Sequence, residues 1–265
     1  MKNIFIFLFF VLFLNAGEKN IKTISHKSKY LEKEQKINIY IPNTNGPHSV
    51  LYLLHGAWGK YSNWVEITDI EYYADKYNFL IVMPDGGEFS WYIDSPIQKN
   101  WNYESYFIKE LIPFIDSNFA TVKNKNGRAI CGLSMGGFGA MHFGLKYSDS
   151  FISVSSLSGV LNILKYAGTK PNLDTAFGSI TNSVWKENDL FQLLEKNKSE
   201  LNLKFDIGLL DKYLTDNREF EEKLKSLNIP FSYSEKKGKH DWDYWKENIS
   251  EHLEFHSNFL LNAKK

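Results

Sequence analysis

The segment R-A-I-C-G-L-S-M-G-G-F-G at residues 128–139 joins a short apolar run to a G-x-S-x-G pattern. Ala129 to Cys131 suits a buried parallel strand, and a helix-compatible segment follows the pattern. A sharp turn of this kind is a nucleophile elbow, which lifts the serine hydroxyl clear of the sheet while the glycines allow neighbouring backbone to come close. Ser134 is therefore the candidate nucleophile. The alternative is an ordinary strand-to-helix turn in which Ser134 only caps the helix.

Apolar runs on both sides of this segment predict the rest of an α/β fold with a mostly parallel central sheet and helices on both faces. Residues 49–54 and 79–84 are apolar throughout, as central parallel strands are. Pro113 should kink or break the helix that contains it. Further strands are predicted at residues 37–41, 151–155, 203–207 and 231–234, and helices at 62–77, 104–119, 137–147, 218–227 and 240–261.

Composition limits the size of the fold and the kind of partner. A chain of 265 residues with 43% hydrophobic residues can bury a large core in one domain. Lysine plus arginine equals aspartate plus glutamate at 31 each, so no net field favours nucleic acid or an anionic membrane surface. We expect a small or neutral molecule as partner, with no nucleic acid and no stable membrane insertion.

The first residues carry the pattern of a signal peptide. Lys2 precedes an apolar run from Ile4 to Leu14, which is followed by Ala16-Gly17 and then by charged residues. The run is short for a membrane span, so we expect a signal peptide at residues 1–17 before one α/β domain at 18–265. Retention as an uncleaved anchor is the alternative, because Leu14 is unfavourable two positions before a cut after Ala16. The single cysteine, Cys131, cannot form an internal disulfide, and export without disulfides suggests a bacterial envelope or secreted protein.

Regular strand signals lapse between residues 159 and 203. This segment contains glycine, proline and a polar run, and within it residues 190–194 predict a short helix. We interpret it as a cap-like insertion over the site, of the kind that sets substrate choice.

Three residue types in a fixed order predict nucleophilic catalysis. Ser134 is followed by an acid after a late strand, Asp211, and by a histidine after the last strand, His240. Serine is a poor nucleophile at neutral pH, so the histidine must take its proton while the acid fixes the imidazole tautomer. Asp206 is the alternative acid. It lies inside its predicted strand, whereas Asp211 follows the turn glycine and is therefore favoured.

The loop after residues 49–54 predicts part of an oxyanion hole. H-G at the end of an early strand places a backbone donor near the nucleophile, and we assign the N–H of Ala57, with the N–H of Met135 as the second donor. His55 is expected to brace this loop rather than to act chemically. Asp85 is expected to cap the glycine turn that follows residues 79–84.

Two histidines on the last predicted helix raise the question of a metal. His252 and His256 stand at i, i+4, but the chain has no H-E-x-x-H glutamate or third ligand near them. We expect a solvated helix face and no metal.

Four segments together resemble one family. L-L-H-G-A-W-G-K-Y-S-N-W (53–64), M-P-D-G-G-E-F-S-W-Y-I-D-S-P (83–96), G-L-S-M-G-G-F-G-A-M (132–141) and H-D-W-D-Y-W (240–245) are similar to the esterase D-like family. That family includes S-formylglutathione hydrolases, feruloyl and acetylxylan esterases, enterochelin esterase-like proteins and mycolyltransferases. The resemblance covers roughly residues 30 to 260. It implies an α/β-hydrolase fold, no cofactor, and a triad of Ser134, Asp211 and His240.

The tryptophans near these motifs have two interpretations. Trp58, Trp91, Trp242 and Trp245 either line an acyl, aryl or sugar pocket or pack in the core.

The sequence thus predicts a secreted or periplasmic serine carboxylesterase that forms an acyl-enzyme on Ser134. Short acyl esters and acyl groups on carbohydrate are the leading substrates, and cytoplasmic glutathione thioesters are disfavoured by export. Acyl transfer to an alcohol and hydrolysis of a siderophore lactone are same-fold alternatives. A non-catalytic binding protein is the alternative of a different class.

Overall fold

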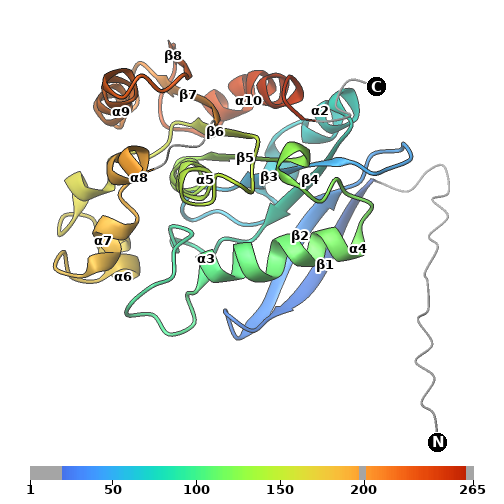
Figure 1. The fold of residues 1–265 in the computed structure, drawn as a ribbon, viewed down its shortest axis with the longest axis horizontal. Helices are drawn as coiled ribbons and strands as arrows, with labels where there is room; N and C mark the ends of the chain where they lie inside the picture. Colours follow the sequence, from blue (N-terminus) through green and yellow to red (C-terminus); the bar gives the residue numbers. More distant parts are fainter. Residues whose placement is uncertain (1–19, 197–200, 261–265) are drawn as a thin grey trace, which may run out of the picture.

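The computed structural model describes residues 20–196 and 201–260. The predicted signal peptide at residues 1–17 and the predicted end of the last helix at residue 261 lie outside the described residues. The described chain forms an eight-stranded sheet in the order β1-β2-β4-β3-β5-β6-β7-β8, with helices on both faces (Figure 1). This arrangement confirms the predicted α/β fold class.

Six of these strands run parallel, and the first two form an antiparallel edge. The strands are β1 (Ile21–Ser28), β2 (Lys33–Tyr40), β3 (Ser49–Leu54), β4 (Phe79–Pro84), β5 (Arg128–Leu133), β6 (Ser153–Leu157), β7 (Asn202–Gly208) and β8 (Ser232–Lys236). Every predicted strand is present within a few residues. The sequence analysis missed β1, because this edge strand is only partly buried and its apolar residues are few.

The helices divide into two layers. On one face, α1 (Asn63–Ile67), α2 (Ile70–Tyr77) and α10 (Trp242–Ser257) pack against the sheet. The opposite face is covered by α3 (Tyr103–Tyr106), the π-helical turn η1 (Phe107–Leu111), α4 (Ile112–Asn118), α5 (Met135–Lys146), α8 (Leu190–Lys196) and α9 (Leu214–Ser226). In Figure 1, α2 and α10 lie along the upper side of the view and α3 and α4 cross its lower side.

Alternation along the buried strands explains why both faces need helices. In β3, Val50, Tyr52 and Leu54 face one core, whereas Leu51 and Leu53 face the other, and all five are fully buried. Successive side chains of a strand point to opposite faces, so a strand that is apolar throughout must be covered on both.

Two predicted helices are interrupted. The helix predicted at residues 62–77 is split into α1 and α2 because Thr68 adopts an extended conformation, with φ −123° and ψ 167°. The helix predicted at residues 104–119 changes to π-helical hydrogen bonding in η1, and Pro113 lies in the first turn of α4 that follows. The backbone stays right-handed helical at Leu111 and Ile112, so the expected kink or break takes the form of this π-helical turn.

The segment 159–203 consists largely of short helices and loops. It contains the 3₁₀ turn η3 (Ile163–Tyr166), α6 (Pro171–Phe177), α7 (Ser183–Glu187) and α8, which corresponds to the helix predicted at 190–194. Its last two residues begin β7.

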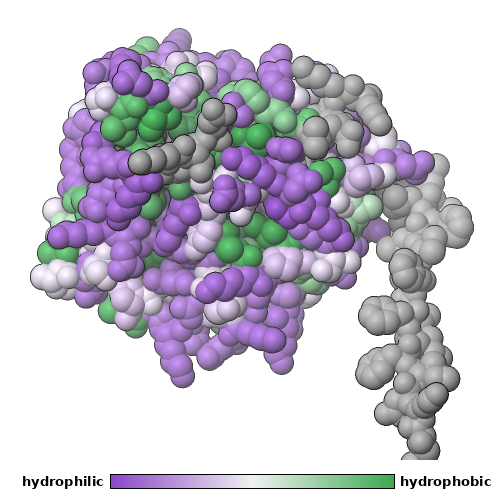
Figure 2. Space-filling model, viewed as in Figure 1, coloured by the Kyte–Doolittle hydropathy of each residue, from purple (hydrophilic) through white to green (hydrophobic). Residues whose placement is uncertain are grey.

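Among the described residues, no helix combines the length and apolar character needed to cross a bilayer. Figure 2 shows a face that is mostly hydrophilic, on which hydrophobic areas are separated from one another.

The turn between β5 and α5 is strained and closely packed. Ser134 has φ 53° and ψ −114°, a conformation that L-residues rarely adopt. A Cβ at Gly132 would lie 2.2 Å from the carbonyl oxygen of Gly136. A Cβ at Gly136 would lie 2.6 Å from the carbonyl oxygen of His55 and 2.7 Å from that of Leu54. The turn therefore requires glycine at both positions, as the elbow prediction supposed.

Gly136→Ala should lower the free energy of unfolding by about 3 kcal/mol, because its Cβ would meet two carbonyl oxygens that cannot move without shifting β3. Gly168→Ala is the matched control. Its Cβ would meet nothing within 4 Å, so only its φ of +73° is strained and the cost should be about 1 kcal/mol. Urea denaturation of both variants measures the difference. Equal losses would show that the close approach at Gly136 does not constrain the turn.

Candidate active site

The backbone of Ser134 is held by hydrogen bonds to the next strand and to its own helix. Its N–H donates to the carbonyl of Leu157 at 3.0 Å, and its carbonyl accepts the N–H of Phe138 at 3.0 Å. The residue is partly exposed although β5 and most of α5 are buried. The strained turn thus presents the hydroxyl at the carboxyl edge of the parallel strands, where ligands bind in open α/β sheets.

Two further side chains, from the loops after β7 and β8, complete a chain of contacts in which His240 lies between Ser134 and Asp211. The Nε2 of His240 lies 2.8 Å from the Oγ of Ser134, and its Nδ1 lies 2.7 Å from the Oδ2 of Asp211. The side chain of Asp211 is 0% exposed and that of His240 is 15% exposed. The acid is therefore sealed from water, whereas the base remains reachable. Because the serine hydroxyl lies within hydrogen-bond distance of the imidazole, it can pass its proton to the Nε2 of His240.

The exit turn of β7 and the loop after β8 are tied together. The N–H of Leu210 donates to the carbonyl of Gly238 at 2.9 Å, two residues before His240. Asp241 caps α10 by accepting the N–H of Tyr244 at 3.2 Å. These bonds fix where the histidine enters the site.

The competing acid lies elsewhere. Asp206 is fully buried, and its Oδ2 is 3.1 Å from the Nε2 of His252. Asp211, not Asp206, therefore contacts His240.

The expected solvated face for His252 and His256 is wrong. Both side chains are 0% exposed, because α10 packs this face against the sheet. The two ring nitrogens of His256 lie 2.8 Å from the hydroxyls of Ser153 and Ser155 on β6, and burial lowers its pKa well below the usual value. The polar partners are supplied by strands distant in sequence, which the i, i+4 spacing alone does not reveal. No group of three potential metal ligands occurs within residues 20–196 and 201–260.

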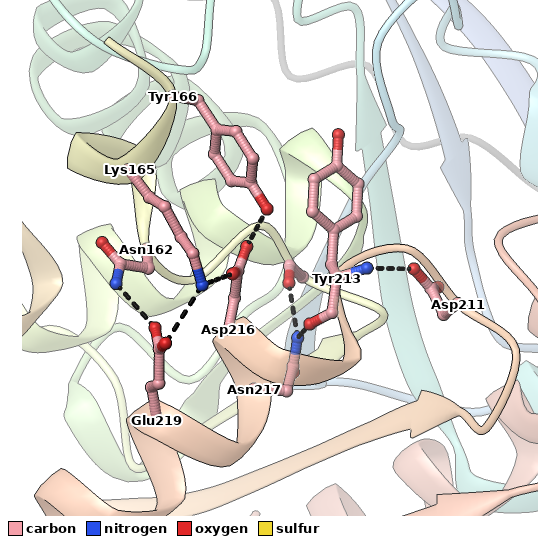
Figure 3. Close-up of polar contacts among 9 residues, drawn as sticks. Asn162, Lys165, Tyr166, Asp211, Tyr213, Asp216, Asn217 and Glu219 are labelled. Atoms are coloured by element: carbon pink, nitrogen blue, oxygen red, sulfur yellow. Dashed lines mark hydrogen bonds and ion pairs between the residues drawn. The ribbon is translucent and has the colours of Figure 1, made fainter.

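A polar network that the sequence analysis missed holds the loop of Asp211. The backbone N–H of Tyr213 donates to the Oδ1 of Asp211 at 2.9 Å, so both carboxylate oxygens have partners. The side-chain amide of Asn217 then donates hydrogen bonds to the carbonyl oxygens of Tyr213 and Gly159, at 3.0 and 2.9 Å (Figure 3). The loop of the acid is thereby bonded to the chain just after β6.

The same network reaches the segment 159–203. Buried Asp216 accepts hydrogen bonds from Tyr166 and from Lys165, and Lys165 also bonds Glu219 at 3.0 Å (Figure 3). Burial raises the pKa of Asp216, so these donors compensate the desolvated carboxylate. The partners are about 50 residues apart, so no local signal marks them.

Tyr213 makes a second contact with the histidine and is itself bonded to Lys170. The Tyr213 ring is 4.9 Å from the His240 ring, and its hydroxyl accepts from the Nζ of Lys170 at 2.6 Å. Burial, helped by nearby Lys212, lowers the pKa of Lys170 to about 8.

The loop after β3 is braced by His55, as expected. The Nε2 of His55 accepts the N–H of Gly86 at 2.8 Å, and the Nδ1 lies 2.8 Å from the carbonyl oxygen of Gly56. Burial lowers the pKa of His55, which suits a neutral bridging imidazole. Asp85 accepts the N–H of Gly87 at 2.8 Å and so caps the glycine turn, also as expected.

The braced loop lies against the nucleophile. A Cβ at Gly56 would stand 3.2 Å from the Cβ of Ser134, and Ala57 borders the cavity above the serine. Met135 is the first residue of α5, so its N–H has no acceptor one turn earlier in the helix. The two residues assigned to an oxyanion hole are thus near the nucleophile: Met135 follows Ser134 in the chain, and Ala57 follows Gly56, which packs against Ser134.

The candidate site opens into a cavity of about 500 Å³ that contains Ser134 and His240 in its lining. Trp58, Trp91, Trp242 and Trp245 also line it, and Asn172 reaches it from α6. The same indoles pack on one another and on the site: the Trp245 ring is 5.1 Å from His240, and Trp242 is 5.3 Å from Trp64. Trp91 and Trp245 are buried and so both pack in the core and line the cavity, whereas Trp58 is exposed and only lines it.

Comparison with known proteins gives one family and several relatives. A family model described as "Putative esterase" matches residues 28–256. An acetyl esterase of Caldicellulosiruptor saccharolyticus is 32% identical over 221 residues, which cover 78% of this chain and 82% of the relative.

Solved structures agree with this result. A ferulic acid esterase is 27% identical with a TM-score of 0.79, covering 90% of this chain and 97% of its own. An S-formylglutathione hydrolase from Agrobacterium tumefaciens has a TM-score of 0.83 at 22% identity, over 93% of this chain and 98% of its own. At that identity the likeness concerns the fold, and the chain has the α/β-hydrolase fold.

Proposed function

The chain belongs to the esterase family and is a serine hydrolase of carboxylic esters, and on this premise we propose the residues and substrates of its reaction. We propose that it is an exported carboxylesterase that cleaves short acyl or carbohydrate-linked esters through an acyl-enzyme on Ser134. The observation that carries the proposal is the continuous contact Ser134–His240–Asp211 at the cavity, with separations of 2.8 and 2.7 Å.

In the proposed first step, the Oγ of Ser134 attacks the ester carbonyl while the Nε2 of His240 takes the hydroxyl proton. The imidazolium is stabilised by Asp211, which accepts from the Nδ1 of His240. His240 then gives the proton to the departing alcohol, and an acyl-enzyme remains. A water molecule, deprotonated by the same nitrogen, attacks this acyl group. The bond to Ser134 then breaks, the carboxylic acid leaves and His240 returns the proton to the Oγ of Ser134.

The tetrahedral intermediates carry a negative oxygen that needs fixed donors. We assign these to the N–H groups of Met135 and Ala57. The amino terminus of α5 adds a favourable dipole at this place. Because His55 and Gly86 hold the Ala57 loop before substrate arrives, the donors need little rearrangement during the reaction.

The substrate assignment rests on the relatives and on the cavity. The relatives include an acetyl esterase and a ferulic acid esterase. A cavity of about 500 Å³ walled by indoles accommodates a small acyl group beside Ser134. Export is proposed from the apolar run and small residues at 1–17.

Purified protein that starts at residue 18 should hydrolyse p-nitrophenyl acetate faster than the butyrate, and the butyrate faster than the octanoate. Polar and charged side chains, such as Lys212 and Asp241, share the cavity lining with the indoles and disfavour a long alkyl chain. Ser134→Ala should lose turnover of all three. Initial rates measure both effects. An octanoate preference would contradict the short acyl assignment, and normal turnover by the alanine variant would contradict Ser134 as nucleophile.

Asp211→Asn should lower kcat by about 10⁴-fold, because the amide no longer holds the imidazole in the reactive tautomer. Asp206→Asn is the matched control. It should leave kcat near the wild-type value but lower the free energy of unfolding by about 3 kcal/mol, because it breaks a buried contact with His252. Kinetics and thermal denaturation of both variants test the assignment. The reverse pattern would make Asp206 the catalytic acid.

A further inference from the structure

A second cavity adjoins the first. It measures about 530 Å³ and shares Trp58, Gly59 and Asn63 with the cavity at Ser134. Its other walls come from β2, from the loop after β4 and from the segment before α3. The two cavities therefore share a wall at the loop that also carries Ala57, and nothing in the reaction described so far uses the second.

Trp58 stands between the two cavities in an unusual state. Its side chain is 70% exposed although it is large and apolar, and its backbone has a φ of 63°. The N–H of Trp58 donates to the carbonyl of Glu88 at 2.6 Å, which fixes this conformation. Strained backbone is retained most often at ligand sites, where it aims a side chain.

An aromatic row continues from Trp58 into the second cavity. The rings of Trp58 and Phe89 are 5.0 Å apart, and those of Phe89 and Trp101 are 5.5 Å apart. Trp101 and Tyr103 line the cavity. An extended ligand could follow these rings away from Ser134.

The polar groups of the second cavity balance in charge. Lys33 and Lys60 carry positive charge, and Asp85 and Glu88 carry negative charge. Lys60 is already paired with Glu66 at 3.1 Å and Lys33 donates to the Tyr103 hydroxyl at 3.0 Å, so neither ammonium group is free to hold an anion. A bare hydrocarbon chain would leave the charged groups poorly solvated. A neutral ligand with many hydroxyls can both donate to the carboxylates and accept from the ammonium groups.

From these features we propose that the second cavity binds neutral sugar residues of the alcohol portion of the substrate. The apolar C–H faces of sugar rings would stack on Trp58 and Trp101, and their hydroxyls would bond the charged groups around them. The acyl group would lie beside Ser134 and the glycan would cross Trp58. This inference rests on the proposed function and specifies its substrate as an acylated oligosaccharide rather than a small alkyl ester.

The first test measures binding without catalysis. Ser134→Ala is titrated with xylotetraose, cellotetraose and maltotetraose by calorimetry. At least one of these neutral oligosaccharides should bind, and adding Trp101→Ala should weaken that binding by about tenfold, because one stacking surface is lost. Absence of binding by all three, or equal binding after Trp101→Ala, would overturn the proposal.

The second test is kinetic and has matched controls. Trp101→Ala should raise KM for acetylated xylotetraose, or for the acetylated form of whichever oligosaccharide binds, by about tenfold and leave p-nitrophenyl acetate turnover unchanged. Lys33→Ala, at an exposed position where folding is not at risk, should raise the same KM. Tyr72→Ala removes an exposed aromatic ring from α2, outside both cavities, and should change the kinetics of neither substrate.

The outcomes separate this inference from the proposed function. Equal KM values for wild type, Trp101→Ala and Lys33→Ala on the oligosaccharide ester would overturn the sugar site while the esterase stands. If the wild type hydrolyses none of the esters, the proposed function is overturned. The calorimetry on Ser134→Ala would still decide whether sugars bind.

Discussion

The strained turn at Ser134 is the constraint on which the rest of the site depends. A residue at φ 53° persists only where its surroundings leave no alternative. Here β5 and α5 pack so closely against the end of β3 that Cβ atoms at Gly132 and Gly136 would collide with backbone. The same close approach brings the loop of Ala57 beside the serine. One packing arrangement thus exposes the hydroxyl and brings beside it the loop that carries the proposed donor Ala57.

The remaining groups are delivered by separate strand ends and secured by contacts between them. β7 and β8 end at the same edge, and the Leu210–Gly238 hydrogen bond joins their exit loops. The acid is buried and bonded on both oxygens, whereas the histidine keeps some exposure toward the cavity. Segment 159–203 is bonded to this region through Asp216 and contributes Asn172 to the cavity. A change in that segment can therefore alter substrate fit without touching the sheet.

Local sequence patterns predicted much of this arrangement. The elbow and the apolar strands follow from residues close together in the chain, and the serine, acid and histidine were each chosen by their place after a predicted strand. The choice of Asp211 over Asp206 also rested on local position, and the structure places Asp211 on His240. The predictions that failed concern features that depend on contacts distant in sequence. The missed strand β1 is recognisable mainly by its pairing with β2. The burial of His252 and His256, which were expected to face solvent, requires the strands beneath α10. Tyr213 and Lys170 gave no signal, because their partners are brought near only by folding.

The central claim is that Ser134 is an activated nucleophile open to substrate. Its most direct test is the intact mass of the protein after treatment with a serine-directed fluorophosphonate, followed by peptide mapping. The account predicts a single adduct on Ser134 that requires His240 and is absent from Ser134→Ala. An unmodified wild-type protein, or an adduct on another residue, would contradict it.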